Sequence, residues 1–483
     1  MPTLTDIVKA YDVRGLVGEQ LDAAVSWSLG AAFAEEVHTG ASVTRIVIGH
    51  DMRASSPELS EAFARGAASR GLDVVLIGLC STDGLYYASG SLDAPGAMFT
   101  ASHNPAAYNG IKLCRAGARP VGQDTGLVTI RDRAQQLVDA GGPDAEPPPS
   151  PTSVGSITRQ DLLHGYAEHL RSLVDLSGIR PLKIVVDAGN GMGGLTTPAV
   201  LGTSAGLAAL PLDIVPLYFE LDGTFPNHEA NPLEPANLRD LQAAVVAAGA
   251  DLGLAFDGDA DRCFVIDELG APVSPSAVTA LVARREIAKE RAAGRDATVI
   301  HNLITSHAVP EVIAEAGGRA VRTRVGHSFI KAEMAKQNAV FGGEHSAHYY
   351  FRDFWFADTG MLAAMHVLAA LGEQSEQPLS QFAAEYERYV SSGEINSRVT
   401  DVAAATARVE AAFAGGPGVE TDRMDGLSVV HAGTPGTAGR DGMWWFNLRP
   451  SNTEPLLRLN AEAQDEPTMA KLRDEVLAIV RAG

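Results

Sequence analysis

Cysteine is scarce in this chain of 483 residues, which contains only Cys80, Cys114 and Cys263. The number is odd, and no two of these residues have the CxxC spacing of a metal-binding or redox pair. So few thiols exclude a disulfide-based framework. We expect the three cysteines to be reduced and the protein to be cytoplasmic.

Long apolar runs are also missing. The most apolar long stretch, residues 198–219, is interrupted by Pro198, Pro211 and Asp213, so it does not predict a membrane span. The N-terminal sequence MPTLTDIVKAYDVRG lacks the apolar core of a secretory signal peptide. We therefore predict a soluble protein with no membrane partner.

Basic residues are fewer than acidic residues. The chain has 38 Lys and Arg against 59 Asp and Glu, which gives a formal net charge of −21. A nucleic-acid-binding protein needs a basic face, so the composition argues against nucleic acid as a partner. An anionic substrate must be held by a few local Arg, Lys and backbone N–H groups.

A proline-rich segment, GGPDAEPPPSPTSVG at residues 141–155, separates a first domain from the rest of the chain. Its proline run favours an extended linker rather than a packed element. At roughly 100–200 residues per domain, the length suggests about three or four domains. We predict domains at residues 1–150, 156–265, 266–380 and 385–483.

Short apolar runs recur in the same order three times along the chain, and such runs are typical of buried parallel strands. We therefore predict an α/β fold with three similar mixed α/β domains, each with a mostly parallel sheet. The runs are RIVIGHD, DVVLIGL and GAMFT in the first repeat, KIVVDAGNG, DIVPLYF and LGLAF in the second, and ATVIHNL, RAVRTRV and NAVFGG in the third.

The last hundred residues or so have a different pattern. VEAAFAGG and PTMAKLRDEVLAIVRAG indicate amphipathic helices, whereas GLSVVH, MWWFNLRP and LLRLNAEA indicate strands. This predicts a smaller C-terminal α+β domain with an antiparallel sheet. The loop RPSNTEP joins its last two strands.

Polar loops follow the third run of each repeat: TASHNP, DGDADR and GGEHSAH. In open α/β sheets, ligands bind beyond the carboxyl ends of the strands. Three such strand ends predict one central cleft that the domains share.

The loop DGDADR places Asp257, Asp259 and Asp261 at every second position. Close carboxylates repel one another, and a hard divalent cation relieves the repulsion. A solvated acidic turn and an aspartyl phosphatase are alternatives, whereas an EF-hand is rejected because Arg262 stands where its loop needs glycine. Mg²⁺ fits best, because it takes a few carboxylates and keeps a position for a phosphate oxygen.

Two further loops carry polar side chains. RPSNTEP offers Arg449, Ser451, Asn452 and Thr453, which suit a phosphate clamp better than a helix cap, because a strand follows. GGEHSAH offers Glu344, Ser346 and His348 to the hydroxyls of a sugar. A zinc site of Glu344, His345 and His348 is the alternative, although the helical context that aligns such ligands is missing.

Isolated residues of interest stand beside predicted strand ends. Of the cations and histidines, Arg14, Lys112 and His327 have the positions expected of functional groups. Arg53 and Arg324 are interpreted as structural or solvated.

Taken together, the loops resemble those of the α-D-phosphohexomutase family, near its phosphomannomutase/phosphoglucomutase branch. TASHNP, DGDADR, GEHSAH and RPSNTEP occur in order, and the resemblance runs from KAYDVRG to RPSNTEP, essentially the whole chain. It implies three mixed α/β domains and a smaller fourth domain around a central cleft. His345 and Ala347 depart from the residues common in relatives, as does Asp83, where relatives commonly have proline.

The resemblance also implies roles for individual residues. Ser102 would be the phosphoserine and a fourth ligand of Mg²⁺, beside Asp257, Asp259 and Asp261. His103 would shape and polarise the Ser102 loop. The remaining roles are charge neutralisation or proton transfer by Arg14, Lys112, Arg262 and His327, and substrate binding by Tyr11, Glu344, Ser346, His348, Arg449, Ser451, Asn452 and Thr453.

The activity implied is interconversion of hexose 1-phosphate and hexose 6-phosphate through a hexose 1,6-bisphosphate, with mannose preferred and glucose also used. Small sugar phosphates would be the partners, and the protein would be a monomer or homodimer. A phosphoglucosamine mutase, a metal-dependent sugar-phosphate phosphatase and a non-catalytic sugar-phosphate binder remain as alternatives.

Overall fold

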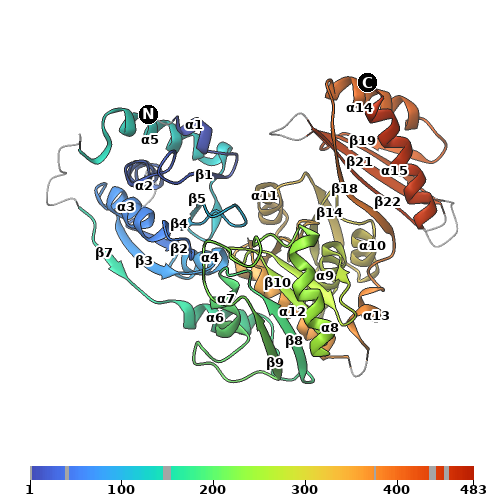
Figure 1. Ribbon diagram of the computed structural model, residues 1–483, viewed down its shortest axis with the longest axis horizontal. Helices are drawn as coiled ribbons and strands as arrows, with labels where there is room; N and C mark the ends of the chain where they lie inside the picture. Colours follow the sequence, from blue (N-terminus) through green and yellow to red (C-terminus); the bar gives the residue numbers. More distant parts are fainter. Residues whose placement is uncertain are drawn as a thin grey trace. The chain divides into compact units, whose positions relative to one another are not determined.

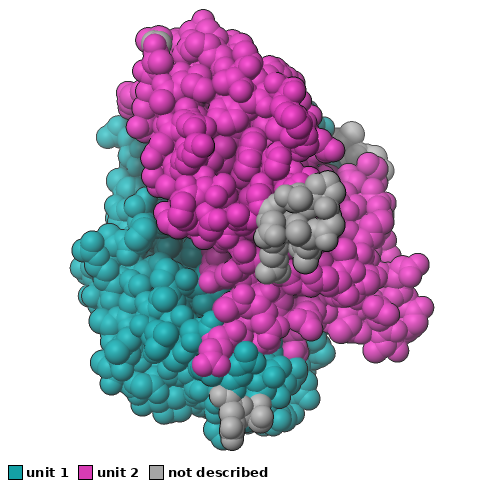
Figure 2. Space-filling view, turned by 90° about the vertical axis from the view of Figure 1, so that its right-hand side faces the viewer, with its two compact units in different colours: residues 1–273, 346–380 teal, residues 274–345, 381–483 magenta. Residues whose placement is uncertain are grey.

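The structure, a computed structural model, describes residues 3–38, 43–144, 154–374, 377–433, 442–450 and 456–482. It contains two compact units, which Figure 2 colours separately. Unit 1 consists of Met1–Val273 and Ser346–Ser380, and unit 2 consists of Ser274–His345 and Gln381–Gly483. Each unit is therefore assembled from two separate stretches of the chain.

Three groups of parallel strands follow the three predicted repeats. In each group the first strand of the repeat lies in the middle, the third strand pairs with one edge and the second with the other. The predicted parallel strands are confirmed. They are β2 (Arg45–His50), β3 (Asp73–Leu79) and β4 (Gly96–Phe99), then β8 (Leu182–Asp187), β9 (Leu212–Leu217) and β10 (Leu252–Phe256), then β13 (Thr298–Asn302), β14 (Arg319–Thr323) and β15 (Phe341–Gly343).

Additional strands make the sheets mixed. β4 and β10 are each followed by an antiparallel partner, so the loops TASHNP and DGDADR connect a parallel strand to an antiparallel one. The additional strands are β1 (Asp12–Leu16), β5 (Tyr108–Arg115), β6 (Arg119–Pro120), β7 (Ile157–Arg159), β11 (Cys263–Asp267), β12 (Pro272–Val273), and the hairpin of β16 (Tyr349–Phe351) and β17 (Ala357–Asp358).

Helices cover the sheets. In the first repeat, α2 and α3 pack against each other (Figure 1), and the rings of Phe33, Phe63 and Phe99 join α2, α3 and β4 at centroid distances of 5.8 and 5.5 Å. The helices are α1 (Leu4–Ile7), α2 (Ala23–His38), α3 (Ser56–Ala68), α4 (Thr82–Ser91), α5 (Leu127–Asp139), α6 (Leu163–Leu173), α7 (Gly193–Val200), α8 (Arg239–Ala248), α9 (Pro275–Ala292), α10 (Ala308–Glu315), α11 (His327–Gln337), α12 (Gly360–Gly372), α13 (Leu379–Ala383), α14 (Val402–Phe413) and α15 (Glu466–Arg481), with 3₁₀ turns η1 (Gln123–Thr125), η2 (Gly142–Asp144), η3 (Pro235–Leu238) and η4 (Arg352–Phe354).

Helix α12 is buried along its whole length. Its sequence, GMLAAMHVLAALG, is apolar on all sides except for His366, which is the pattern of a helix enclosed by protein. At its first residue a Cβ would lie 2.6 Å from the carbonyl carbon of Arg262, so glycine is needed for this close approach. The helix therefore packs directly behind the loop that carries the three aspartates.

The C-terminal domain has a five-stranded antiparallel sheet in the order β18-β22-β21-β20-β19. Figure 1 shows α14 and α15, in orange and red, beside this sheet. Phe446, Leu459 and Val476 lie in the core between strands and helices. The predicted α+β pattern is confirmed. The strands are β18 (Val390–Arg398), β19 (Val419–Asp422), β20 (Leu427–Ala432), β21 (Met443–Pro450) and β22 (Leu456–Ala463).

The three cysteines are buried and form no disulfide. Among the residues that the structure describes, no helix combines the length and the apolar character that a membrane crossing requires.

Candidate active site

The loop TASHNP forms a tight turn at the carboxyl end of β4. Ser102 has a φ of 47°, a left-handed conformation that is uncommon for a residue with a side chain. Its N–H donates to Thr100 Oγ1 at 2.9 Å, and its hydroxyl donates to Asp257 Oδ2 at 2.7 Å. Ser102 is only 4% exposed. The hydroxyl is thus aimed at the aspartate loop by the shape of the turn.

Arg53 holds the backbone of this turn in place. Its Nη2 donates to the carbonyl oxygens of Ser102 and Asn104 at 2.9 and 2.6 Å. Its Nη1 donates to those of Pro105 and Tyr108, each at 3.0 Å. Arg53 was interpreted as structural or solvated, and the structure shows that it holds the Ser102 loop, which the sequence did not reveal.

Asp51 neutralises the charge of Arg53 by forming an ion pair with it. Arg53 Nε lies 3.2 Å from Asp51 Oδ2, and both side chains are at most 1% exposed. Asp51 Oδ1 accepts hydrogen bonds from the Arg53 N–H at 3.0 Å and from Ser56 Oγ at 2.6 Å. The pair is a buried salt bridge that fixes the guanidinium under the loop.

Arg14, in β1, forms hydrogen bonds to the same turn. Its Nη1 donates to the carbonyl oxygen of Ala101 at 2.6 Å and to the side-chain oxygen of Asn104. Its Nε pairs with Asp12 at 2.8 Å. The predicted role of Arg14 beside the Ser102 loop is consistent with this position.

The loop DGDADR follows β10 and lies against the Ser102 turn. Asp257, Asp259 and Asp261 are at most 2% exposed, and one carboxylate oxygen from each lies within 4.8 Å of the others. Gly258 is needed here because a Cβ would lie 2.4 Å from the Ser102 carbonyl oxygen. The two loops are therefore in contact, and three carboxylates gather beside one serine.

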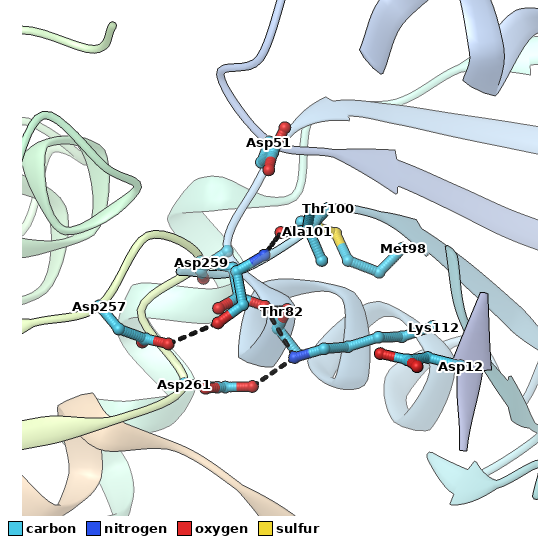
Figure 3. A network of polar contacts seen from close by, with 12 residues as sticks. Asp12, Asp51, Thr82, Met98, Thr100, Ala101, Lys112, Asp257, Asp259 and Asp261 are labelled. Carbon is cyan, nitrogen blue, oxygen red and sulfur yellow. Dashed lines mark hydrogen bonds and ion pairs between the residues drawn. The ribbon is translucent and has the colours of Figure 1, made fainter. Parts of the chain in front are cut away.

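Lys112 joins two of these carboxylates from β5. Its Nζ donates to Asp259 Oδ2 at 2.7 Å and to Asp261 Oδ2 at 2.5 Å, as Figure 3 shows from close by. Burial alone would lower the pKa of Lys112, but the charges of Asp259 and Asp261 raise it above its usual value. Lys112 is therefore held as a cation.

Asp259 is held in the charged form by its neighbours. Burial acts to raise its pKa, but Lys112 and the hydroxyl of Thr82, which donates at 2.6 Å, lower it below the usual range. Thr82 begins α4, so this helix starts at the aspartate loop.

Arg262 and His103 complete the surroundings of Ser102. Arg262 Nε donates to Asp257 Oδ2 at 3.0 Å, and its Nη2 donates to His103 Nδ1 at 2.7 Å. Burial and the charges of Arg262 and Arg14 lower the pKa of His103 to about 3, so its imidazole is neutral at physiological pH. Burial raises the pKa of Asp257 to about 7, against the charge of Arg262 and with added repulsion from Asp261 and Asp259.

The three aspartates fit a small divalent cation. Asp259 Oδ1 and Asp261 Oδ1 are buried and accept no hydrogen bond from the residues that the structure describes. A buried carboxylate oxygen without a donor is costly, and a metal ion supplies the missing partner. Oxygen ligands alone suit Mg²⁺. The electrostatics of the loop thus support an acidic metal-binding site.

The loop GEHSAH contributes residues to both units. In unit 2, Glu344 is 3% exposed and accepts a hydrogen bond from Asn302 Nδ2 at 3.0 Å. In unit 1, Ser346 Oγ lies 3.0 Å from His348 Nδ1. Among the described residues, the clusters that could hold a metal ion include neither Glu344 nor His345.

The remaining predicted residues are described to different extents. Arg449, near the end of β21, is 7% exposed, and its Nη2 pairs with Glu394 at 2.6 Å. Tyr11 is half-buried just before β1. His327 begins α11, but its side chain is not described. Ser451, Asn452 and Thr453 lie outside the described residues.

Asp83, which departs from the pattern of relatives, is a fully buried carboxyl group in α4. It accepts hydrogen bonds from the hydroxyls of Tyr166 at 2.8 Å and Thr359 at 2.7 Å, and from Ser81. The carboxyl therefore joins α4, α6 and the segment that precedes α12. Proline at this position would remove all three hydrogen bonds.

Asp83 is expected to make the stability of the protein depend on pH. Burial raises its pKa to about 6, although the hydroxyls of Ser81, Thr359 and Tyr166 lower it. Its pKa in the unfolded chain is about 3.9. The folded state therefore binds more protons between about pH 4 and pH 6, and the free energy of unfolding should fall by about 3 kcal/mol as pH rises through this window.

Urea denaturation from pH 4 to pH 7 tests this expectation. Asp83→Asn should remove most of the fall, whereas Asp213→Asn, which changes an exposed carboxyl, should retain the wild-type slope. Equal slopes for wild type and Asp83→Asn would contradict the role given to burial.

Sequence models of four protein domains match this chain in order. They are described as phosphoglucomutase/phosphomannomutase alpha/beta/alpha domain I at residues 5–137, domain II at 164–270, domain III at 274–389, and the C-terminal domain at 394–479.

Individual proteins are similar over nearly the full length. A protein named "Phosphohexose mutases" from Xanthomonas campestris is 40% identical over 98% of this chain and 99% of its own. A phosphomannomutase of Salmonella montevideo is 39% identical over 98% of each chain. A crystal structure of a phosphoglucomutase/phosphomannomutase family protein from Burkholderia thailandensis has a TM-score of 0.83 and 30% identity, covering 100% of this chain and 98% of its own.

Proposed function

Since this chain belongs to the phosphoglucomutase/phosphomannomutase family and is a phosphohexomutase, we propose that it interconverts mannose 1-phosphate and mannose 6-phosphate, with the glucose pair as a second substrate. A phosphoryl group on Ser102 and a hexose 1,6-bisphosphate would be the intermediates. One observation carries the proposal: the Ser102 hydroxyl lies 2.7 Å from Asp257, beside a group of three buried carboxylates and two cations.

Phosphoryl transfer requires charge neutralisation and alignment more than covalent help from the protein. We propose that Mg²⁺ is held by Asp257, Asp259, Asp261 and an oxygen on Ser102, where it would polarise the phosphoryl group. Arg262 and Lys112 would stabilise the equatorial oxygens. Arg53 and Arg14 hold the loop backbone, so that the reacting oxygen stays in line with the incoming sugar hydroxyl.

In the first half-reaction, the sugar hydroxyl attacks phosphorus, the new P–O bond forms and the bond from phosphorus to Ser102 Oγ breaks. The attacking hydroxyl must lose a proton. We propose that Lys112 or His327 accepts this proton.

The second half-reaction requires the bisphosphate to turn over and return its other phosphoryl group to Ser102. We propose that Glu344, Ser346 and His348 bind the sugar hydroxyls, with Tyr11 as a further contact. Arg449, Ser451, Asn452 and Thr453 would hold the phosphate that is not reacting. In support, Arg449 Nη1 is buried and donates no hydrogen bond to the described residues.

The experiment that tests this function is intact-mass analysis of the purified protein after incubation with glucose 1,6-bisphosphate. A fraction heavier by about 80 Da, the mass of one phosphoryl group, is expected for the wild type. Ser102→Ala should show no such fraction. If the wild type takes up no phosphoryl group, or if Ser102→Ala takes it up equally, the phosphoserine mechanism is wrong.

A comparison of substrates tests the proposed preference. Mannose 1-phosphate should give the highest kcat/KM, with glucose 1-phosphate second, in matched assays. A higher value for glucosamine phosphate would favour a phosphoglucosamine mutase instead. Stoichiometric release of free phosphate would favour a phosphatase.

A further inference from the structure

His348 lies against the aspartate loop in unit 1. Its backbone forms an isolated antiparallel bridge with Arg262, and its Nε2 lies 3.8 Å from Asp261 Oδ1. Asp358, in the β17 strand of the neighbouring hairpin, contributes a third group. One ligand atom from each of Asp261, His348 and Asp358 lies within 4.8 Å of the other two. The fold thus gathers an imidazole and two carboxylates beside the aspartate triad.

The imidazole of His348 is oriented as a metal ligand would be. Its Nδ1 lies 3.0 Å from Ser346 Oγ. In the tautomer with the proton on Nδ1, the ring donates to the serine oxygen and presents the Nε2 lone pair to Asp261. Metal-binding histidines are commonly fixed by such a hydrogen bond from the other ring nitrogen.

Asp261 offers a buried oxygen that lacks a hydrogen-bond donor. Its Oδ2 accepts from Lys112, whereas its Oδ1 accepts no hydrogen bond from the described residues. Arg262 Nε is 4.0 Å from Oδ1, beyond hydrogen-bond distance. With its side chain 2% exposed, Asp261 has little access to water as a substitute. A carboxylate oxygen can bridge two cations, so this oxygen is available to an ion beside His348 as well as to the cation of the triad.

We propose that Asp261, His348 and Asp358 form a second metal site, which takes Zn²⁺ or a similar late first-row divalent ion. One nitrogen and two carboxylate oxygens suit such ions, whereas the all-oxygen triad suits Mg²⁺. Zinc with ligands at about 2.0–2.1 Å needs ligand atoms about 3.3 Å apart in a tetrahedron. The 3.8 Å between His348 Nε2 and Asp261 Oδ1 needs only a small side-chain rotation to reach that spacing.

Asp261 belongs to both groups, so the two metals would share one carboxylate. Zinc on Nε2 would hold the imidazole of His348, which is proposed to bind the sugar. Zn²⁺ is therefore expected to inhibit the enzyme at the second site. This consequence rests on the proposed function, whereas the binding of zinc does not.

Zinc stoichiometry measured by equilibrium dialysis tests the binding. Because Zn²⁺ can also enter the triad, Asp259→Asn is used to disable that site while leaving Asp261, His348 and Asp358 intact. The wild type is expected to bind two Zn²⁺ and Asp259→Asn one. Adding His348→Gln or Asp358→Asn to Asp259→Asn should weaken the remaining site by roughly 100-fold or more. Adding Asp353→Asn, an exposed carboxyl on the same hairpin, should leave it unchanged.

Two results would overturn the second site: no zinc bound by Asp259→Asn, or equal zinc affinity with and without His348→Gln. A zinc titration of the wild type, followed by the ¹⁵N resonances of its imidazoles, needs no variant and so does not depend on whether the variants fold. Zn²⁺ should shift the Nε2 resonance of His348, and an unshifted resonance at two equivalents of zinc would contradict the proposal. Because no catalysis is measured, this outcome is independent of phosphorylation at Ser102.

Discussion

Ser102→Ala is expected to reduce mutase turnover by roughly 10⁴-fold or more, the scale on which enzymes lose activity when their nucleophile is removed. The serine oxygen is the atom that would carry the phosphoryl group, and no other hydroxyl is placed on Asp257 by a hydrogen bond among the described residues. The measurement is the initial rate of glucose 6-phosphate formation from glucose 1-phosphate with added bisphosphate.

The loss of turnover in Ser102→Ala should come from the missing serine oxygen and not from a change in the fold. The variant retains the backbone of the turn, which Arg53 and Arg14 hold through carbonyl oxygens. Its urea midpoint should therefore stay close to the wild-type value. Ser172→Ala, at an exposed position in α6, is a matched control that should keep full turnover. Turnover of Ser102→Ala within tenfold of the wild type would refute a phosphoserine intermediate.

Arg53→Met is expected to lower the free energy of unfolding by about 3–5 kcal/mol, the scale of breaking a buried ion pair from one side. The change leaves the Asp51 carboxyl buried without its ion-pair partner. It also removes the donors to four carbonyl oxygens of the Ser102 turn. Urea denaturation measures the loss of stability, and the rate of phosphorylation by bisphosphate measures the loss of order in the loop.

Two further variants separate charge from geometry. Arg53→Lys keeps the charge beside Asp51 but lacks the planar fork that reaches several carbonyls, so it should recover only part of the stability. Asp51→Asn combined with Arg53→Met should cost less than the sum of the single changes, because no charge is left unpaired. If Arg53→Met has wild-type stability and a wild-type rate of phosphorylation, the Ser102 turn keeps its conformation without Arg53.

Local patterns in the sequence were enough to predict the parallel strands and the loops that carry the aspartates and Ser102. Runs such as RIVIGHD are short, rich in β-branched residues and closed by polar turns, and the structure places a strand at Arg45–His50. The loops were predictable because parallel strands present their carboxyl ends together. β18 was missed because its sequence, VSSGEINSR, is polar and lacks an apolar run.

The residues that hold the site in place, Arg53 and Asp83, could not be predicted from the local sequence. Arg53 and Asp83 have partners far away in the chain, such as Ser102 at 49 positions and Thr359 at 276 positions. A charged residue has the same local pattern whether it is buried or exposed. Burial of these groups depends on elements that meet only in the folded protein. The sequence of α12 did contain one usable signal, because a helix that is apolar on all sides must be enclosed.

The division of unit 1 into two stretches, Met1–Val273 and Ser346–Ser380, has a consequence for synthesis on the ribosome. When residue 273 has emerged, α12 does not yet exist, and Asp83 lacks the hydroxyl of Thr359. At 5–20 residues per second, the 107 residues from 274 to 380 take roughly 5 to 20 s to make. During that interval the growing chain exposes the apolar surface that α12 later covers, so unit 1 can complete its folding only after much of unit 2 has been translated. A chain that ends at residue 273 should therefore aggregate, although it contains Ser102 and all three aspartates of the triad.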